Sequence, residues 1–245
     1  MPLHFLLDEP VGAAPGDAVT LTGQEAHHAA AVRRVRVGEE VTVGDGRGAW
    51  LTGECEAVSP KEVVVRITRR DDIPAPSPRL VLVQALAKGD RDELAVQAAT
   101  ELGVDEIVPW QASRSVSRWD AAKAAKGTAR WATIAREAAK QAHRAWLPVV
   151  SPLSTTNDLA RRAAASTVLV LEPTAREPLS RIALDARDER DILLVVGPEG
   201  GIAPDELARL EEAGGSLVRL GDTVLRTSTA GPAAIAVAST SLGRW

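Results

Sequence analysis

The sequence has few aromatic and sulfur-containing side chains. Its 245 residues include one cysteine, Cys55, one phenylalanine, Phe5, and no tyrosine. A lone cysteine excludes an internal disulfide and fits a reducing compartment, so we interpret Cys55 as a small strand residue. The core must therefore be built from Val, Leu and Ala, together with six tryptophans.

Long apolar runs and targeting signals are also missing. No stretch approaches the roughly 20 apolar residues that a membrane helix needs. The N-terminus, MPLHFLLDEP, has neither a basic leader nor a long apolar centre. With 45% hydrophobic residues, the chain can bury one large core or two smaller ones. We expect a cytoplasmic protein that makes no membrane contact.

The net charge of −4 gives no whole-protein sign of nucleic-acid binding. The distribution of charge says more, because residues 111–147 carry only two acidic side chains, Asp120 and Glu137. The basic side chains of this segment are Arg114, Arg118, Lys123, Lys126, Arg130, Arg136, Lys140 and Arg144. Such a segment can face phosphates or can be a solvated helix face, and the charge pattern leaves both interpretations open.

Residues 1–70 carry short β-branched segments that predict strands at Val41–Val43, Trp50–Glu54 and Val63–Thr68. The glycine-rich GDGRG at 44–48 joins strand to strand, which favours a hairpin turn over a nucleotide-binding loop. The adjacent His27 and His28 would point in different directions on a helix, so we expect no metal pair there. We predict a small β-barrel in this part of the chain.

The proline-rich segment DDIPAPSPR resists both helix and central strand, which makes it the best candidate for a linker. We therefore predict a first domain at 1–72, a linker at 73–78 and a second domain at 79–245. Directly after the linker, RLVLVQAL is a continuous apolar run, typical of a parallel strand covered on both faces.

Helix and strand patterns alternate through the second domain. Asp90 as N-cap, Glu93 as its capping-box partner and Gly103 as a stop signal predict one helix, and the strand VDEIVPW follows it. Further apolar runs lie at Thr167–Leu171, Ile192–Val196 and Leu217–Leu220. This alternation predicts an α/β domain with a doubly wound parallel sheet.

Neither G-x-G-x-x-G nor G-x-x-x-x-G-K-[ST] occurs in the sequence. The glycine turns GPEGGI and LGDTVLRTSTAG instead follow late strands, where open α/β sheets bind ligands. Pro204 suits a first helical position, and Asp205 and Glu206 suit the first turn. Because acidic residues there disfavour a phosphate ligand, we favour S-adenosylmethionine over ATP or NAD. Alone, GPEGG would also fit an ordinary strand-to-helix turn.

With LGDTVLRTSTAG following GPEGG, the chain closely resembles the SPOUT class of methyltransferases, whose chain end threads through a trefoil knot. Within that class it resembles the RsmE family, which methylates N3 of a uridine in small-subunit ribosomal RNA. The blocks that carry this resemblance occur in the family's order: HHAAAVRRVRVGEEVTVGDGRG, KGDRDELAVQAATELGVDEIVPWQASRS and REAAKQAHRAWLPVV. The first block resembles the family's PUA-like RNA-binding barrel.

The resemblance implies specific site residues. It implies a first cofactor loop made of Gly197, Pro198, Glu199, Gly200 and Gly201. A second loop comprises Leu220, Gly221, Leu225, Arg226, Thr227 and Ala230, and Leu171 and Glu172 would form a third wall. Contacts to RNA are expected from Arg34, Lys88, Arg114, Gln141 and Arg144. The expected partners are small-subunit ribosomal RNA or the 30S subunit and a second copy of the chain, and no metal is expected. The apolar stretch Ala230–Ala238 offers a helix for dimerisation, although a helix buried within the chain would have the same pattern.

Arg226 is the candidate catalytic residue, positioned to orient the uracil base or stabilise its developing anion. The alternative is a structural ion pair to Glu199 or Asp222, and no side chain stands out as the general base. Ser228 departs from the family, which commonly has an acidic residue there, and we expect Ser228 to cap a final helix starting near Thr229.

Other side chains have plainer interpretations. The tryptophans at 110, 119, 131 and 146 could stack on bases, but burial is the default expectation. Lys88 could be a surface lysine at a helix end, and Gln141 an interior amide. Other functions left open are a knotted methyltransferase acting on a ribose 2′-hydroxyl or on transfer RNA, and a non-catalytic RNA-binding protein of this fold.

Overall fold

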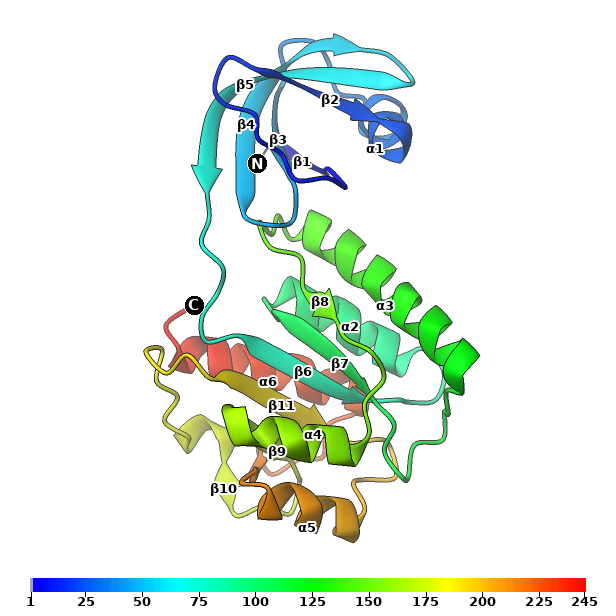
Figure 1. Cartoon of the computed structure of the whole chain (residues 1–245), viewed down its shortest axis with the longest axis vertical. Coiled ribbons are helices and arrows are strands. Elements are labelled where there is room, and N and C mark those ends of the chain that lie inside the picture. The colour runs from blue at the N-terminus through cyan, green and yellow to red at the C-terminus, as the bar shows by residue number, and fades with distance from the viewer. Residues whose placement is uncertain (1) are drawn as a thin grey trace. The chain divides into compact units, whose positions relative to one another are not determined.

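The computed structural model describes residues 2–245 (Figure 1). The chain divides into two compact units. The first runs up to Ala75 and includes Ala139–Leu147, and the second comprises Pro76–Ala138 and Pro148–Trp245. None of the helices in residues 2–245 combines the length and the apolar character needed to cross a bilayer.

The segment 139–147, which the sequence groups with the second domain, belongs to the first unit because it pairs with the GDGRG turn. The N–H of Gly48 donates to the carbonyl of Ala145 at 3.0 Å, and the N–H of Leu147 donates to the carbonyl of Gly46 at 3.0 Å. A Cβ on Gly46 would lie 2.5 Å from the Leu147 side chain. Glycine is therefore required where this segment packs on the turn.

The first unit contains a five-stranded sheet in the order β1-β3-β4-β5-β2. Its elements are β1 (Leu3–Leu6), β2 (Ala18–Thr22), α1 (Gly23–His27), the π-helical turn η1 (His28–Val32), β3 (Glu40–Gly44), β4 (Ala49–Val58) and β5 (Glu62–Asp72). GDGRG connects β3 to β4, so the prediction of a strand-to-strand turn is confirmed. Cys55 is a buried residue of β4 inside this unit's core, as expected.

The second unit contains a seven-stranded sheet in the order β10-β12-β9-β11-β6-β7-β8, in which every pairing is parallel. The strands are β6 (Leu80–Ala85), β7 (Glu106–Trp110), β8 (Val149–Val150), β9 (Ser166–Leu171), β10 (Glu177–Pro178), β11 (Asp191–Val196) and β12 (Ser216–Arg219). The predicted parallel sheet is confirmed. The threading of the chain end through a knot stays a prediction.

Helices cover both faces of this sheet (Figure 1). They are α2 (Arg91–Glu101), α3 (Ala121–Gln141), α4 (Thr156–Arg162), α5 (Pro204–Glu212) and α6 (Thr227–Ser241), with short 3₁₀ turns η2 (Ala163–Ala165) and η3 (Leu179–Arg181). Along β6, Leu80 and Leu82 face a core shared with α2, α3 and α6, whereas Val81 and Val83 face a core shared with α4 and α5. This two-sided burial explains the continuous apolar run of β6.

Asp90 is the N-cap of α2, as predicted, but two expected capping contacts, at α2 and at α6, do not form. The side chain of Asp90 makes no capping hydrogen bond, and Glu93 forms an ion pair with Arg130 of α3 instead of a capping box. Asp92 accepts the N–H of Ala87 at 3.1 Å and so holds the turn before α2. At α6 the N-cap is Arg226, and Ser228 lies within the first turn, so it does not cap the helix.

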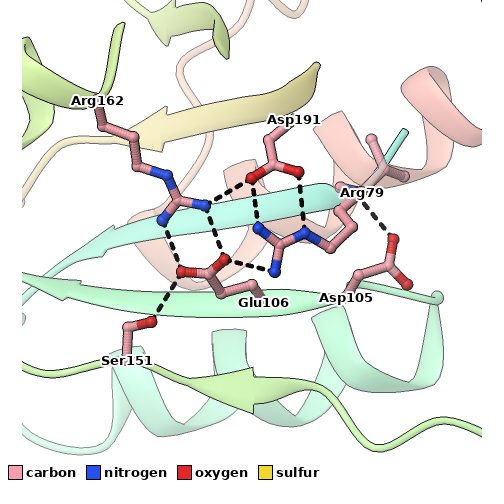
Figure 2. A network of polar contacts seen from close by, with 7 residues as sticks. Arg79, Asp105, Glu106, Ser151, Arg162 and Asp191 are labelled. Carbon is pink, nitrogen blue, oxygen red and sulfur yellow. Dashed lines mark hydrogen bonds and ion pairs between the residues drawn. The ribbon is translucent and has the colours of Figure 1, made fainter. Parts of the chain in front are cut away.

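At the opposite end of the sheet from the glycine turns, the residues at the amino ends of three strands form a charged network (Figure 2). Arg162 donates two hydrogen bonds to the buried carboxylate of Glu106, at 2.6 and 2.7 Å, and one to Asp191 at 2.9 Å. Arg79 bridges the same two carboxylates, and Ser151 adds a hydrogen bond to Glu106 at 2.8 Å. These contacts fasten β7 and β11 to the start of β6 and the end of α4.

Candidate cofactor pocket and substrate surface

A cavity of about 460 Å³ opens at the carboxyl ends of β9, β11 and β12. The predicted cofactor and catalytic residues line it with one exception, Gly200. Those brought together are Leu171, Glu172, Gly197, Pro198, Glu199, Gly201, Leu220, Gly221, Leu225, Arg226, Thr227 and Ala230. The two glycine turns of the sequence therefore form one concave site within the second unit.

Glycine is required at the turn after β11. A Cβ on Gly197 would lie 2.6 Å from Cγ1 of Ile202, closer than real Cβ contacts allow. Gly201 has a φ of +71°, a left-handed conformation that other residues adopt only with strain. The turn can therefore pass tightly from β11 toward α5 and leave its backbone facing the cavity.

Sequence patterns missed several residues of the lining. These are Arg91, Pro173, Val196, Ile202, Val218, Arg219, Thr223 and Val224. Most of them flank the predicted turns, so a wider window around each turn would have included them. Arg91 comes from the start of α2, more than a hundred residues before GPEGG, and no local pattern connects it to the cavity.

Glu199 is held by the turn that precedes α2. Its carboxylate accepts the N–H of Lys88 at 3.1 Å and a hydrogen bond from the guanidinium of Arg91 at 2.8 Å. Burial alone would raise the pKa of Glu199, but its hydrogen bonds to backbone N–H groups and Arg91, together with the Arg91 charge, lower it below the ordinary value. Glu199 is therefore a carboxylate at neutral pH.

The ion pairs considered as alternatives for Arg226 are not formed. Glu199 pairs with Arg91, and Asp222 pairs with Arg219 at 2.7 Å. Across residues 2–245 no hydrogen bond or ion pair of the Arg226 guanidinium is found, and the side chain is exposed beside the cavity. Its backbone, by contrast, is fixed as the N-cap of α6, since its carbonyl accepts the N–H groups of Thr229 and Ala230. A charged group is thus held at the site, and no side chain among the described residues neutralises it.

The loop before α3 is fastened to α5 by a buried carboxylate. Glu206 accepts the N–H of Ser113 at 3.0 Å, the hydroxyl of Ser113 at 2.8 Å and that of Thr156 at 2.7 Å. Pro204 begins α5, and Asp205 and Glu206 lie in its first turn, as predicted. The loop carries Arg114, whose guanidinium donates to the carbonyl of Gly200 at 3.2 Å. Arg114 therefore lies beside the GPEGG turn.

The predicted RNA contacts divide between the two units. Exposed Lys88 and Arg114 adjoin the GPEGG turn in the second unit. Exposed Arg34, Gln141 at the end of α3, and the half-buried Arg144 belong to the first unit. Gln141 and Arg144, expected in the second domain, belong to the first compact unit because 139–147 pairs with the GDGRG turn. Gln141 is exposed and is not an interior amide.

The tryptophans are mostly structural. Trp110 and Trp131 are fully buried, which excludes base stacking. Trp119 packs edge-on against Trp131, with ring centroids 5.5 Å apart. Trp146 donates its indole N–H to the carbonyl of Ile73 at 2.9 Å. The default expectation of burial is correct for Trp110 and Trp131, while Trp119 and Trp146 remain half-buried.

Sequence comparison gives the family. A profile described as RNA methyltransferase domain matches residues 74–239, and one described as RNA methyltransferase PUA domain matches residues 21–68. Ribosomal RNA small subunit methyltransferase E from Mycobacterium bovis is 44% identical over 235 residues, covering 94% of this chain and 89% of that protein. The chain belongs to this family of methyltransferases. The Bacillus subtilis protein of the same name is 33% identical and covers 86% of this chain and 85% of its own length.

Solved structures support membership of the methyltransferase E family. A ribosomal RNA small subunit methyltransferase E from Neisseria gonorrhoeae, crystallised with S-adenosyl methionine, superposes with a TM-score of 0.85 at 32% identity. The alignment covers 98% of both chains. The match therefore includes both the five-stranded and the seven-stranded sheets.

Proposed function

We propose that this chain transfers a methyl group from S-adenosylmethionine to N3 of a uridine in small-subunit ribosomal RNA. The observation that carries the proposal is the cavity at the strand ends, which gathers the two glycine turns and Arg226, an arginine without an ion-pair partner among residues 2–245. The family relatives are named for methylation of small-subunit ribosomal RNA, and the N3 position follows from the family resemblance of the sequence.

The residues of the cavity fit this cofactor. About 460 Å³ is within the usual range for small-molecule sites. Leu171, Leu220, Leu225 and Ala230 offer apolar contact, while the turn at Gly197 exposes backbone groups. Glu172 brings a carboxylate to the same wall, which suits a ligand with cationic and hydroxyl groups and disfavours a triphosphate. When bound, S-adenosylmethionine supplies an electrophilic methyl group on a sulfonium.

In this proposal Arg226 acts on the base that receives the methyl group. Removing the proton from uridine N3 places negative charge on the ring and its carbonyl oxygens, and a guanidinium stabilises that charge where it develops. Because Arg226 has no partner within residues 2–245, it does not have to break an ion pair to reach the base. The general base stays unassigned.

We further propose that Lys88 and Arg114 bind RNA next to the cavity, and that Arg34, Gln141 and Arg144 bind it on the first unit. Phosphate contacts of this kind position a substrate without reading its sequence. The proposed substrate is the ribosomal RNA or the 30S subunit in the cytoplasm. We keep the boundary at 73–78 as a proposal for where the two functional domains join.

A homodimer is part of the same proposal, but the apolar stretch Ala230–Ala238 offers less surface than its composition suggests. Ala234, Ile235 and Ala238 are completely buried within the chain, where α6 packs against α2. The half-exposed Leu94 of α2 remains available beside α6. We therefore place the proposed contact on α2 and the outer side of α6.

The substrate can be tested in a strain that lacks this protein. We expect nucleoside mass spectrometry of its small-subunit RNA to show the loss of one N3-methyluridine, restored by the intact gene and not by an Arg226→Ala version. Loss of a 2′-O-methylated nucleoside, or of a modification in transfer RNA, would replace the proposed target. An unchanged set of nucleosides, together with no binding of S-adenosylmethionine in calorimetry, would identify a non-catalytic RNA-binding protein.

A further inference from the structure

Gln84 is a fully buried polar residue that the proposed chemistry does not use. It lies near the carboxyl end of β6, in the centre of the sheet, paired in register with Val196 of β11 and Pro109 of β7. Burying an amide is unfavourable unless its hydrogen bonds are replaced, and an apolar side chain would fill the same space. Packing alone therefore does not explain why an amide occupies this position.

The amide group of Gln84 connects three separate parts of the chain. Its Nε2 donates to the carbonyl of Ala85 at 3.1 Å and to the hydroxyl of Thr227 at 2.8 Å. The hydroxyl of Thr227 in turn donates to the carbonyl of Gly197 at 2.9 Å. Since a hydroxyl has one proton, accepting from Gln84 leaves that proton free to point at Gly197.

Both ends of this relay are at the cavity. Gly197 begins the GPEGG turn and Thr227 begins α6, and both line the cavity, whereas Gln84 does not. Arg226 directly precedes Thr227, so whatever fixes Thr227 also fixes the origin of the arginine side chain. One turn further along α6, a Cβ on Gly231 would lie 2.7 Å from the Leu82 side chain, which shows how closely the helix packs on β6.

Within residues 2–245, only the nitrogen of the Gln84 amide is hydrogen-bonded, and no protein donor reaches Oε1. Of the two bonds from that nitrogen, one stays at the neighbouring Ala85 and the other crosses to Thr227. The contact with Thr227 is therefore the one long-range hydrogen bond of this amide in the described residues.

We propose that Gln84 is a positioning residue for methyl transfer: through the hydroxyl of Thr227 it holds the two glycine turns, and with them Arg226, in the arrangement that binds the cofactor and reacts. This inference rests on the proposed function. Gln84 itself touches neither cofactor nor substrate. Because Gln84 acts through one hydrogen bond, an experiment can distinguish the loss of this bond from a general loss of packing.

A double-mutant cycle tests the relay. The variants are Gln84→Leu, Thr227→Val and the two combined, with Gln84→Met as a milder form of the first change. Calorimetry with S-adenosylhomocysteine gives the cofactor Kd, and turnover on small-subunit RNA gives kcat and KM. We expect each single change to raise Kd and lower kcat about tenfold, the effect of roughly one hydrogen bond. The double variant should be no worse than the poorer single one.

Thr227→Ser and Thr100→Val are the matched controls. Thr227→Ser keeps the hydroxyl and should restore most of the activity. Thr100 is also fully buried, but its hydroxyl bonds to Val96 within α2, so its loss should lower Tm and leave Kd and kcat unchanged.

Two results would overturn the inference. One is a Gln84→Leu or Gln84→Met protein that behaves like Thr100→Val, with a lower Tm but normal Kd and kcat. The other is a pair of single effects that simply multiply in the double variant. If the unaltered protein bound no cofactor, the proposed function would be refuted and this inference with it; normal binding and turnover in the variants would refute this inference alone.

Discussion

At the scale of single residues, the ion pairs around the cavity distinguish arginines that are paired with a carboxylate from an arginine that can bind a ligand. Arg91 is paired with Glu199 and Arg219 with Asp222, whereas Arg226 has no partner in residues 2–245. The sequence alone could not decide this, because Glu199 and Asp222 were both plausible partners for Arg226. The pairing depends on where α2 begins in space, and that is set by long-range packing.

Changing Arg226 to alanine tests its assignment. We expect Arg226→Ala to lower kcat by about 100- to 1000-fold, the usual effect of removing one group that stabilises developing negative charge. The Kd for S-adenosylmethionine should stay nearly unchanged. Arg219→Ala is the control, because it removes the same charge from the same cavity but from a side chain already paired with Asp222. Equal losses of binding and turnover in Arg226→Ala would make Arg226 a structural residue.

At the scale of secondary structure, the buried strands and the starts of α2 and α5 were predictable, whereas the side-chain contacts that cap α2 were not. The runs at Thr167–Leu171 and Ile192–Val196 match β9 and β11 to within one residue, since a strand buried on both faces is apolar at every position. The capping box at Asp90 failed because Glu93 finds Arg130 on another helix. A capping contact predicted from local sequence does not form when the side chain pairs with an opposite charge on another helix.

The carboxylate that joins α5, α4 and the Arg114 loop gives a second test. Glu206→Gln keeps the size of the side chain but turns one acceptor into a donor facing Ser113 and Thr156. We expect the free energy of unfolding to fall by about 1 to 3 kcal/mol, the cost of leaving buried donors unsatisfied. Urea denaturation measures it, with Glu211→Gln on the exposed side of α5 as control. If Glu206→Gln lowered the free energy of unfolding no more than the control does, the hydrogen bonds of Glu206 would not be needed for stability.

At the scale of the whole molecule, the sequence predicted two folded parts and the architecture of the second, while the boundary between the two functional domains stays a prediction. Residues 139–147 begin in the last turn of α3, whose earlier residues belong to the second unit, so nothing in their local pattern assigns them to the first. Their long-range contacts do so: the backbone pairing with the GDGRG turn, the ion pair of Lys140 with Glu25 and the hydrogen bond of Trp146 to Ile73. Likewise, the resemblance could name the residues of the cofactor loops, but not the ion pairs that leave Arg226 available.

The charged network at the amino ends of the strands predicts how stability depends on pH. Burial alone would raise the pKa of Glu106, but the hydrogen bonds from Arg162 and Ser151 and the charges of Arg162 and Arg79 lower it below its ordinary value. Burial likewise opposes ionisation of Asp191, and Arg79 and Arg162 lower its pKa. Groups whose pKa is lower in the folded state stabilise it above their unfolded pKa and lose that contribution as pH falls through the folded value.

We therefore expect the free energy of unfolding, measured with urea from pH 7 to about pH 3, to decrease below about pH 5. Arg162→Met should cost about 3 kcal/mol at neutral pH, because it leaves Glu106 buried with a weaker partner. Arg162→Met should also make the free energy of unfolding fall less steeply as the pH decreases below about 5. An Arg187→Met control removes an exposed pair with Asp185 and should change neither. An unchanged slope of this decrease in Arg162→Met would contradict this account of the network.

The position of β11 in the sheet has a consequence for synthesis. β11 lies between β9 and β6, but β6 is made more than a hundred residues earlier. As the chain leaves the ribosome, β6 can pair with β7 on one side, while its other edge has no partner until residue 196 has emerged. The nascent domain therefore carries an open apolar edge through much of its translation, and such an edge can template wrong pairing. The strand that precedes the GPEGG turn is also the one that joins β9 to β6 in the sheet.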